Sequence, residues 1–127
     1  MKYLGIDFGL KRVGIALSDD GGTMAFPKYV LNNDKNLMIN IKKICDDEKV
    51  EKIIIGDSKD SNMKDNPVMK EIRRFTDVIF KEIKLPTEFQ LEFMTSQQAV
   101  HLQGENDMID ASAAAIILQS FLDRLKK

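Results

Sequence analysis

The sequence predicts a single α/β domain built on a mixed five-stranded sheet with helices on both faces. Three observations predict it: apolar runs joined by tight turns at the start, a switch to helical periodicity after residue 34, and alternating strands and helices from there on. A chain of 127 residues has room for one compact core. We therefore expect residues 1–127 to form one domain with one functional site.

The opening segment is expected to be an antiparallel meander with strands at residues 2–8, 12–18 and 26–31. A tight link at residues 9–11 joins the first two strands, and the Asp-Asp-Gly-Gly sequence at 19–22 is a strong turn signal. The third strand is weaker, because Pro27 interrupts it at its start.

The later elements alternate between helix and strand. Apolar residues at helical spacing predict helices at residues 34–49, 66–84 and 109–125, with a short additional helix at 95–102. The run Ile53-Ile54-Ile55 predicts a buried parallel strand at 51–56. Residues 87–93 alternate between Phe89, Leu91 and Phe93 on one face and Glu88, Gln90 and Glu92 on the other, which predicts a fifth strand.

Composition limits the classes of function. The net charge of −1 and the pI near 5.8 argue against binding nucleic acid through a broad basic surface, so any such footprint must be local. The one cysteine, Cys45, lies on an apolar helical face and is expected in the core. The chain starts with a strand rather than a leader, and no apolar run approaches the ~18 residues of a membrane span. We expect a cytoplasmic protein without a membrane partner.

Asp7 is the most informative residue. It interrupts an apolar strand, where a carboxylate must be paired with a base, hydrogen-bonded at the turn, or bound to a metal. One interpretation is structural: Asp7 caps the following turn or pairs with Lys11 or Arg12. The other interpretation is that Asp7 binds a metal ion, which requires further carboxylates nearby.

Glu92 and Asp110 are the candidate partners of Asp7. They fall near the end of the fifth strand and at the start of the last helix. Carboxylates without a His or Cys cluster are hard oxygen ligands that suit Mg²⁺ or Mn²⁺. The structural alternatives are a solvated strand face for Glu92 and an N-terminal helix acid for Asp110. Asp57 either adds a fourth carboxylate or starts a polar loop, and we favour the loop.

The chain resembles the YqgF family, whose members are described as Holliday-junction resolvases or pre-16S rRNA nucleases. The resemblance spans nearly the whole chain and rests on four segments: Gly5-Ile6-Asp7-Phe8-Gly9 with Lys11-Arg12-Val13-Gly14-Ile15-Ala16 and Ser18-Asp19; Ile54-Ile55-Gly56 followed by Asn66-Pro67; Glu92 with Thr95-Ser96 and Ala99; and Asp110 with Ala113-Ala114 and Ile116-Ile117-Leu118.

This resemblance implies an RNase H-like fold and a nuclease site. It assigns catalysis and binding of Mg²⁺ (or Mn²⁺) to Asp7, Glu92 and Asp110, and we expect Lys11, Arg12 and Thr95 to contact the nucleic acid. The implied substrate is structured nucleic acid, either an rRNA precursor processed at the 5′ end of 16S rRNA or a Holliday junction. The ribosome is a further candidate partner, and the chain is expected to be a monomer or a weak homodimer.

Two departures from the family pattern keep other functions open. Leu91 and Phe93 stand where the family usually has aspartate and arginine, and Asp57-Ser58 stands where it usually has Leu-Pro. The missing arginine removes a phosphate or structural contact. One alternative is therefore a non-catalytic RNA- or ribosome-binding module with the same fold. Another is a phosphate-binding lobe like those of actin-like ATPases and sugar kinases, although one 127-residue lobe lacks their second half.

Overall fold

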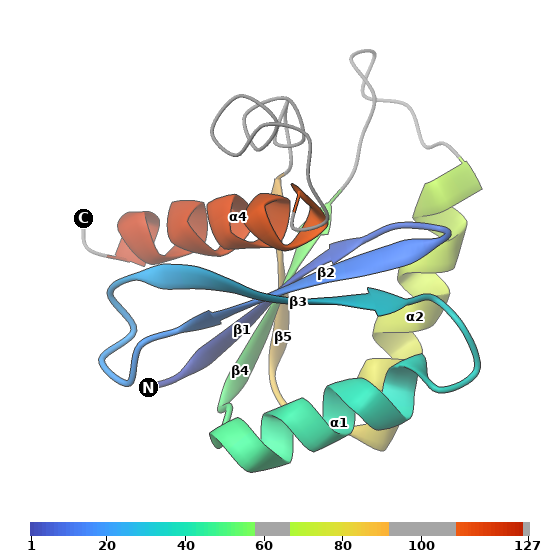
Figure 1. Cartoon of the computed structure of the whole chain (residues 1–127), viewed down its shortest axis with the longest axis horizontal. Helices are drawn as coiled ribbons and strands as arrows, with labels where there is room; N and C mark the ends of the chain where they lie inside the picture. Colours follow the sequence, from blue (N-terminus) through green and yellow to red (C-terminus); the bar gives the residue numbers. More distant parts are fainter. Residues whose placement is uncertain (58–66, 92–108, 126–127) are drawn as a thin grey trace.

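The computed structural model is an α/β fold in which one sheet lies between two layers of helices (Figure 1). It describes residues 1–57, 67–91 and 109–125, except for the side chains of residues 57, 67–69, 91, 109 and 110. The strands are β1 (Tyr3–Phe8), β2 (Arg12–Ser18), β3 (Ala25–Asn32), β4 (Lys52–Asp57) and β5 (Thr87–Leu91). The helices are α1 (Leu37–Glu48), α2 (Pro67–Glu82) and α4 (Ile109–Leu125).

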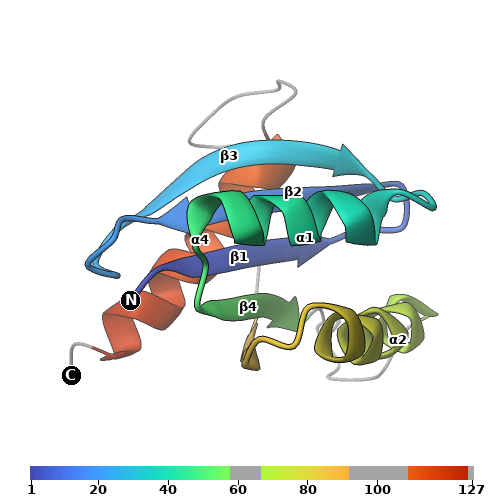
Figure 2. The same ribbon diagram turned by 90° about the horizontal axis from the view of Figure 1, so that it is seen from below.

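The five strands form one mixed sheet in the order β3-β2-β1-β4-β5 (Figure 2). β1 pairs antiparallel with β2, which pairs antiparallel with β3, as the predicted meander requires. β1 pairs parallel with β4, and β4 pairs parallel with β5. The carboxyl ends of β1, β4 and β5 therefore lie at one edge of the sheet, with β1 at its centre.

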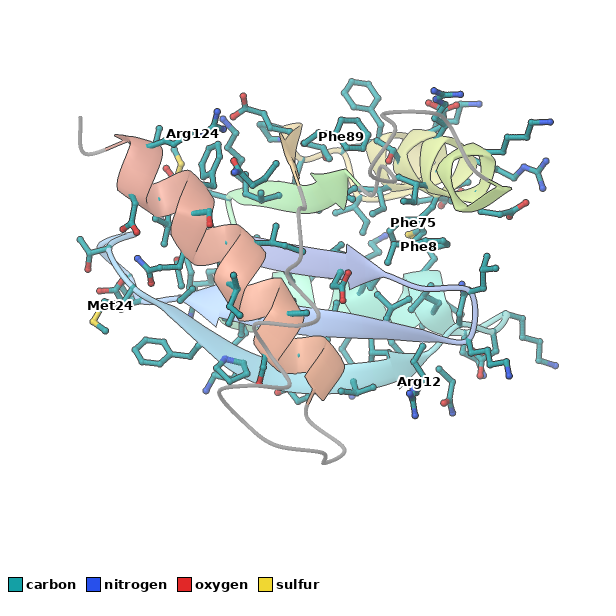
Figure 3. All side chains as sticks on the ribbon, turned by 90° about the horizontal axis from the view of Figure 1, so that it is seen from above. Phe8, Arg12, Met24, Phe75, Phe89 and Arg124 are labelled. Carbon is teal, nitrogen blue, oxygen red and sulfur yellow. The ribbon has the colours of Figure 1, made fainter. Side chains whose placement is uncertain are left out.

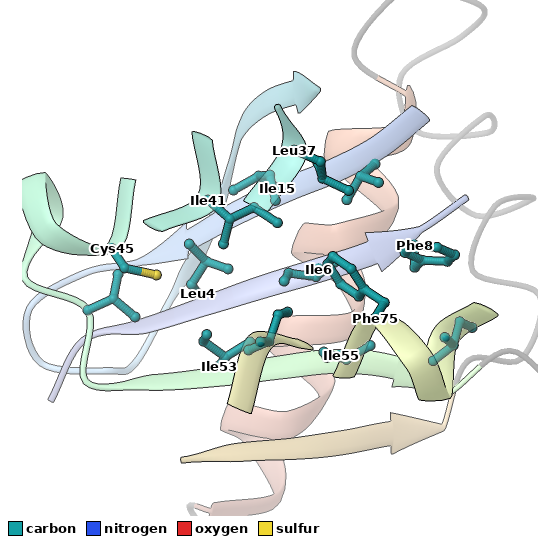
Figure 4. Packing of buried hydrophobic residues seen from close by; sticks show 14 of the residues in the cluster. Leu4, Ile6, Phe8, Ile15, Leu37, Ile41, Cys45, Ile53, Ile55 and Phe75 are labelled. Atoms are coloured by element: carbon teal, nitrogen blue, oxygen red, sulfur yellow. The ribbon is translucent and has the colours of Figure 1, made fainter. Parts of the chain in front are cut away.

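The larger core lies between the sheet and helices α1 and α2 (Figure 4). β1 contributes Leu4, Ile6 and Phe8 to it, and the predicted apolar stripes of α1 and α2 face these residues. Ile6 is fully buried, and burying a side chain of this size stabilises the fold by about 1.5–3 kcal/mol. Cys45 belongs to this core, as predicted.

The second core lies between the opposite face of the sheet and α4, so helices cover both faces as predicted (Figure 1). Its alanines bring the helix close to the strands. A Cβ atom built on Gly5 would lie 2.8 Å from the Leu118 Cβ and 3.1 Å from the Ala114 carbonyl oxygen. Within the described residues, no helix is both long and apolar enough to cross a bilayer.

Two details correct the sequence predictions. β3 starts at Ala25 and runs through Pro27, which therefore does not interrupt the strand. The pairing with β2 shifts between Ile15 and Ala16, so a bulge on this edge strand accommodates the proline. Asp57 is the last residue of β4 rather than the first residue of a loop. The short helix predicted at 95–102 lies outside the described residues.

Candidate functional site

Asp7 is the buried carboxylate of the central strand, only 9% exposed. Side chains alternate between the two faces of a strand. Ile6 belongs to the core beneath α1 and α2, whereas Tyr3 belongs to the core beneath α4. Asp7 is four residues after Tyr3, and an even separation along a strand puts both side chains on the same face. Asp7 therefore lies on the α4 face. A carboxylate in this position must be balanced by hydrogen bonds, a cation or a metal ion.

Glycines flank Asp7 on both neighbouring strands. Asp7 lies opposite Gly14 in the pairing of β1 with β2. Continuing the parallel register one residue past the Ile6–Ile55 pair places Asp7 beside Gly56. Both glycines are buried. Because glycine carries no side chain, neither neighbouring strand places a side chain beside the carboxylate, which is typical of places where a ligand or another backbone approaches a strand closely.

Arg12 lies on the same face as Asp7. It stands two residues before Gly14 on β2, which makes it the diagonal neighbour of Asp7 in the antiparallel pair. Diagonal neighbours have Cα atoms about 7–8 Å apart, within reach of a long side chain. Arg12 is exposed. A long cationic side chain therefore starts within reach of Asp7.

The link between β1 and β2 holds Lys11 at the same edge. The Asn33 side-chain amide donates a hydrogen bond to the Gly9 carbonyl oxygen at 2.8 Å, and the Asn33 backbone N–H donates one to the Lys11 carbonyl oxygen at 2.9 Å. A Cβ atom at Gly9 would lie 2.5 Å from the Arg12 carbonyl oxygen. The link is thus tight and braced, and it presents an exposed lysine beside Arg12.

Helix α4 approaches the site from above the sheet, crossing it diagonally (Figure 3). The ring of Phe121 packs edge-on against the ring of Tyr3, with 5.8 Å between the ring centroids. Ala114, nearer the start of α4, packs against Gly5, which is further along β1. The start of α4 therefore points toward the carboxyl end of β1. Asp110 is four residues before Ala114 and shares its helical face, about one 5.4 Å turn further along. The backbone of Asp110 is therefore directed toward the level of Asp7.

Gln90 is the residue that the sequence reasoning missed. The polar face of β5 could be read as solvated, and Glu88 is indeed exposed and paired with Lys52. Gln90, however, is only 9% exposed, whereas the neighbouring Phe89 is 43% exposed (Figure 3). Gln90 pairs with Gly56 and so belongs to the same row as Asp7 on the α4 face. A polar residue that is buried while its aromatic neighbour is exposed indicates a polar site.

The Gln90 side chain has a buried oxygen with no hydrogen-bond partner, Oε1. A buried polar group left unsatisfied costs about 1–3 kcal/mol, so such groups in native proteins call for an explanation. The Ser112 Oγ on α4 is the other unsatisfied buried side-chain atom within the described residues. Gln90 differs from Ser112 in standing beside a glycine and in the row of the buried carboxylate.

The structure tests only part of the predicted carboxylate set. Glu92 and Thr95 lie outside the described residues, as does the side chain of Asp110. Within the described residues, no group of three His, Cys, Asp or Glu side chains is close enough to hold an ion. The convergence of Asp7, Glu92 and Asp110 therefore stays a prediction.

The described residues nevertheless fit a hard divalent cation. The polar atoms in this row are oxygens: the Asp7 carboxylate would be the ligand, and the partnerless Gln90 amide oxygen stands across Gly56 from it. Oxygen donors of this kind suit Mg²⁺ or Mn²⁺ rather than softer metals. Cys45 plays no part, because it lies in the core on the opposite face and burial raises its pKa to about 12.

Comparison with known sequences gives consistent matches. A family model described as RuvX, Holliday junction resolvase, matches residues 1–124. A protein of Nitratidesulfovibrio vulgaris (strain Miyazaki F) is 33% identical over an alignment of 133 positions, which covers 97% of this chain and 94% of that protein. A protein of Clostridium kluyveri is 33% identical over an alignment of 138 positions, which covers the full length of both chains. Both carry the name "Putative pre-16S rRNA nuclease".

Comparison with solved structures supports the fold. The Thermus thermophilus RuvC structure in complex with a Holliday junction substrate has a TM-score of 0.64 at 15% identity, covering 98% of this chain and 96% of that chain. The Fowlpox virus resolvase in complex with Holliday junction DNA has a TM-score of 0.61 at 12% identity and covers both chains fully. The RNase H-like fold predicted from the sequence is thereby confirmed.

Proposed function

Because this chain belongs to the RuvX family of Holliday junction resolvases, we propose that it is a metal-dependent nuclease that cleaves phosphodiester bonds in structured nucleic acid. The proposed catalytic unit is one domain comprising residues 1–127. Its proposed compartment is the cytoplasm, and its proposed state is a monomer or weak homodimer.

The observation that carries the proposal is the environment of Asp7. Asp7 is buried on the central strand, between Gly14 and Gly56, with Arg12 as its diagonal neighbour. A carboxylate that shares an ion with a phosphate group is favoured where the neighbouring strands add no side chain beside it and where a cation is near enough to bind the phosphate.

The proposed roles of the residues follow from their positions. Asp7, with Glu92 and Asp110 as predicted partners, would hold one or two Mg²⁺ or Mn²⁺ ions. A bound divalent ion supplies activation of water and stabilisation of the oxygens in an in-line phosphoryl displacement. Arg12 and Lys11 would bind the phosphate backbone, with Thr95 as a further proposed contact. The burial of Asp7 keeps bulk water away and strengthens its interactions with positive charge.

Two substrates fit the family. The relatives named for pre-16S rRNA support processing of the 5′ end of an rRNA precursor, with the ribosome as a further proposed partner. The family description supports cleavage of Holliday junctions. A non-catalytic RNA- or ribosome-binding module is the competing function, because the net charge is −1 and Leu91 and Phe93 replace the family's usual aspartate and arginine.

The decisive experiment is cleavage of labelled four-way junction, duplex, single-stranded RNA and an rRNA precursor, with Mg²⁺ or Mn²⁺ and with EDTA. We expect metal-dependent cleavage by the wild type and none by Asp7→Asn. Binding by Asp7→Asn should be similar or tighter, because the substitution removes a negative charge. Equal cleavage by the two proteins would assign the activity to a contaminant, and the non-catalytic function would then be adopted.

A further inference from the structure

We propose that Gln90 is part of the cation site at Asp7, its Oε1 accepting a hydrogen bond from a water molecule in the hydration shell of the ion. The inference rests on the proposed metal-dependent function and adds to it a neutral residue from β5. Its starting point is the buried, partnerless Oε1 atom of Gln90.

The position of Gln90 relative to Asp7 supports the proposal. The strand pairings place Asp7, Gly56 and Gln90 in one row on the α4 face. Neighbouring strands lie about 4.8 Å apart, so the Cα atoms of Asp7 and Gln90 are separated by about 10 Å. Both side chains rise from the sheet on either side of a residue without a side chain. Gly56 is thus bordered in its row by a carboxylate on one side and an amide on the other.

The chemistry of the amide oxygen selects its partner. Oε1 accepts hydrogen bonds and cannot donate them. A phosphate oxygen is also an acceptor, so it cannot satisfy Oε1. Because Oε1 is buried, its partner must also be small. Mg²⁺ keeps several of its waters when it is bound through one or two carboxylates, and those waters are strongly polarised donors. A hydrated ion at Asp7 therefore provides the size and polarity of partner that Oε1 lacks.

A structural role for Gln90 makes a different prediction. If Gln90 only filled space, an apolar side chain of the same length would fill it better and would leave metal binding unchanged. If Gln90 serves the ion, the same substitution should weaken metal binding while leaving the metal-free protein as stable as before or more stable. Under the proposal, metal affinity falls without a loss of metal-free stability, whereas under a purely structural role metal affinity does not change.

The test is calorimetric titration of Mn²⁺ into wild type, Gln90→Met and Gln90→Glu, with thermal unfolding of each protein in EDTA. Residues that support a metal site through hydrogen bonds typically change its affinity by about 10–100-fold when they are replaced. We expect Gln90→Met to bind Mn²⁺ at least tenfold more weakly. Gln90→Glu should retain or exceed wild-type affinity, because it keeps an acceptor and adds a negative charge. Gln90→Leu serves as a second apolar variant if Gln90→Met does not fold.

Two controls separate the possible failures. Ser112→Ala removes the other partnerless buried oxygen of the described residues, which lies on α4 and outside the Asp7 row, and it should bind Mn²⁺ like the wild type. Asp7→Asn should lose the binding. If the wild type binds Mn²⁺ no better than Asp7→Asn does, the proposed metal dependence of the protein is wrong. If the wild type binds, Asp7→Asn does not, and both apolar Gln90 variants retain wild-type affinity, only the inference about Gln90 is wrong.

Discussion

Asp7 lies directly opposite Gly14 in the antiparallel pairing of β1 and β2, so the buried carboxylate has no side chain beside it on that strand. A long residue at position 14 would place a side chain directly beside the Asp7 carboxylate. Glycine at this position adds none, so the carboxylate is bordered on that strand by backbone alone.

The first prediction is that Mg²⁺ or Mn²⁺ raises thermal stability through Asp7. A ligand that binds only the native state stabilises it by about 2.7 kcal/mol when the free ion is a hundredfold above its Kd. Asp7→Asn should abolish most of this increment and leave the fold intact. The measurement is the melting temperature with metal and with EDTA, supported by circular dichroism. An equal metal response in both proteins would mean that the ion binds elsewhere.

The second prediction concerns the cations of the β1–β2 link. The double substitution of Lys11→Ala and Arg12→Ala should weaken nucleic-acid binding and flatten its salt dependence, because each lost phosphate contact lowers the slope of log K against log salt by about 0.7–0.9. Fluorescence anisotropy at several salt concentrations measures both. The matched control is Lys42→Ala with Lys43→Ala on α1, two exposed lysines that should leave the slope unchanged. If both double substitutions changed binding and its salt dependence equally, Lys11 and Arg12 would contribute only through the overall charge of the protein and not through specific phosphate contacts.

The third prediction tests the geometry of the same link. Gly9→Ala places a Cβ atom 2.5 Å from the Arg12 carbonyl oxygen, a contact that forces the backbone to move. We expect a loss of about 1–3 kcal/mol in unfolding free energy, as for other overpacked sites, together with weaker nucleic-acid binding. Urea denaturation measures the loss in unfolding free energy. Gly21→Ala is the control, because its Cβ would meet only the Asp19 Oδ2 at 3.9 Å. Similar losses at both positions would argue against the close contact.

The fourth prediction concerns stability in acid. The Asp19 carboxylate accepts hydrogen bonds from the Thr23 hydroxyl and backbone N–H, both at 2.7 Å, and from the Met24 N–H at 3.1 Å. The Thr23 hydroxyl is the largest cause that lowers the pKa of Asp19 from 3.8 to about 2. The folded-state pKa lies below the unfolded one, so this stabilisation is present above pH 4 and is lost as the pH falls toward 2. Asp19→Ala should be less stable at pH 7 and should lose less between pH 4 and 2 in urea titrations. Parallel curves for the two proteins would contradict the role of the turn.

Most of the fold could be predicted from local periodicity. The bounds of β2 and α4 agree with the predicted ranges, because each element carries a sustained apolar pattern. Pro27 was misjudged, because a proline removes only one donor and an edge strand can lose that donor at a bulge. Such a bulge depends on pairing with β2, which no local pattern encodes.

The candidate site was predicted in part. Asp7 could be identified because a carboxylate in an apolar strand is costly to bury unless it is paired, hydrogen-bonded or bound to a metal ion. Gln90 could not, because the alternation of β5 defines two faces but not which of them is covered. That depends on the register between β4 and β5, which sets Gln90 beside Gly56. Glu92, Thr95 and the Asp110 carboxyl group stay predictions from sequence.

The packing of α4 on β1 has a consequence for biosynthesis. The last helix meets the first strand at Gly5, so roughly one hundred residues of chain must be made between the two halves of this contact, a separation that slows folding. At translation rates of about 5–20 residues per second, α4 follows β1 by about 5–20 seconds. During that interval the nascent chain carries Asp7 without the helix that bears Asp110. Until α4 is made, the face of β1 that carries Gly5 and Asp7 is not covered by this helix, so the second core forms only after the sheet has been synthesised.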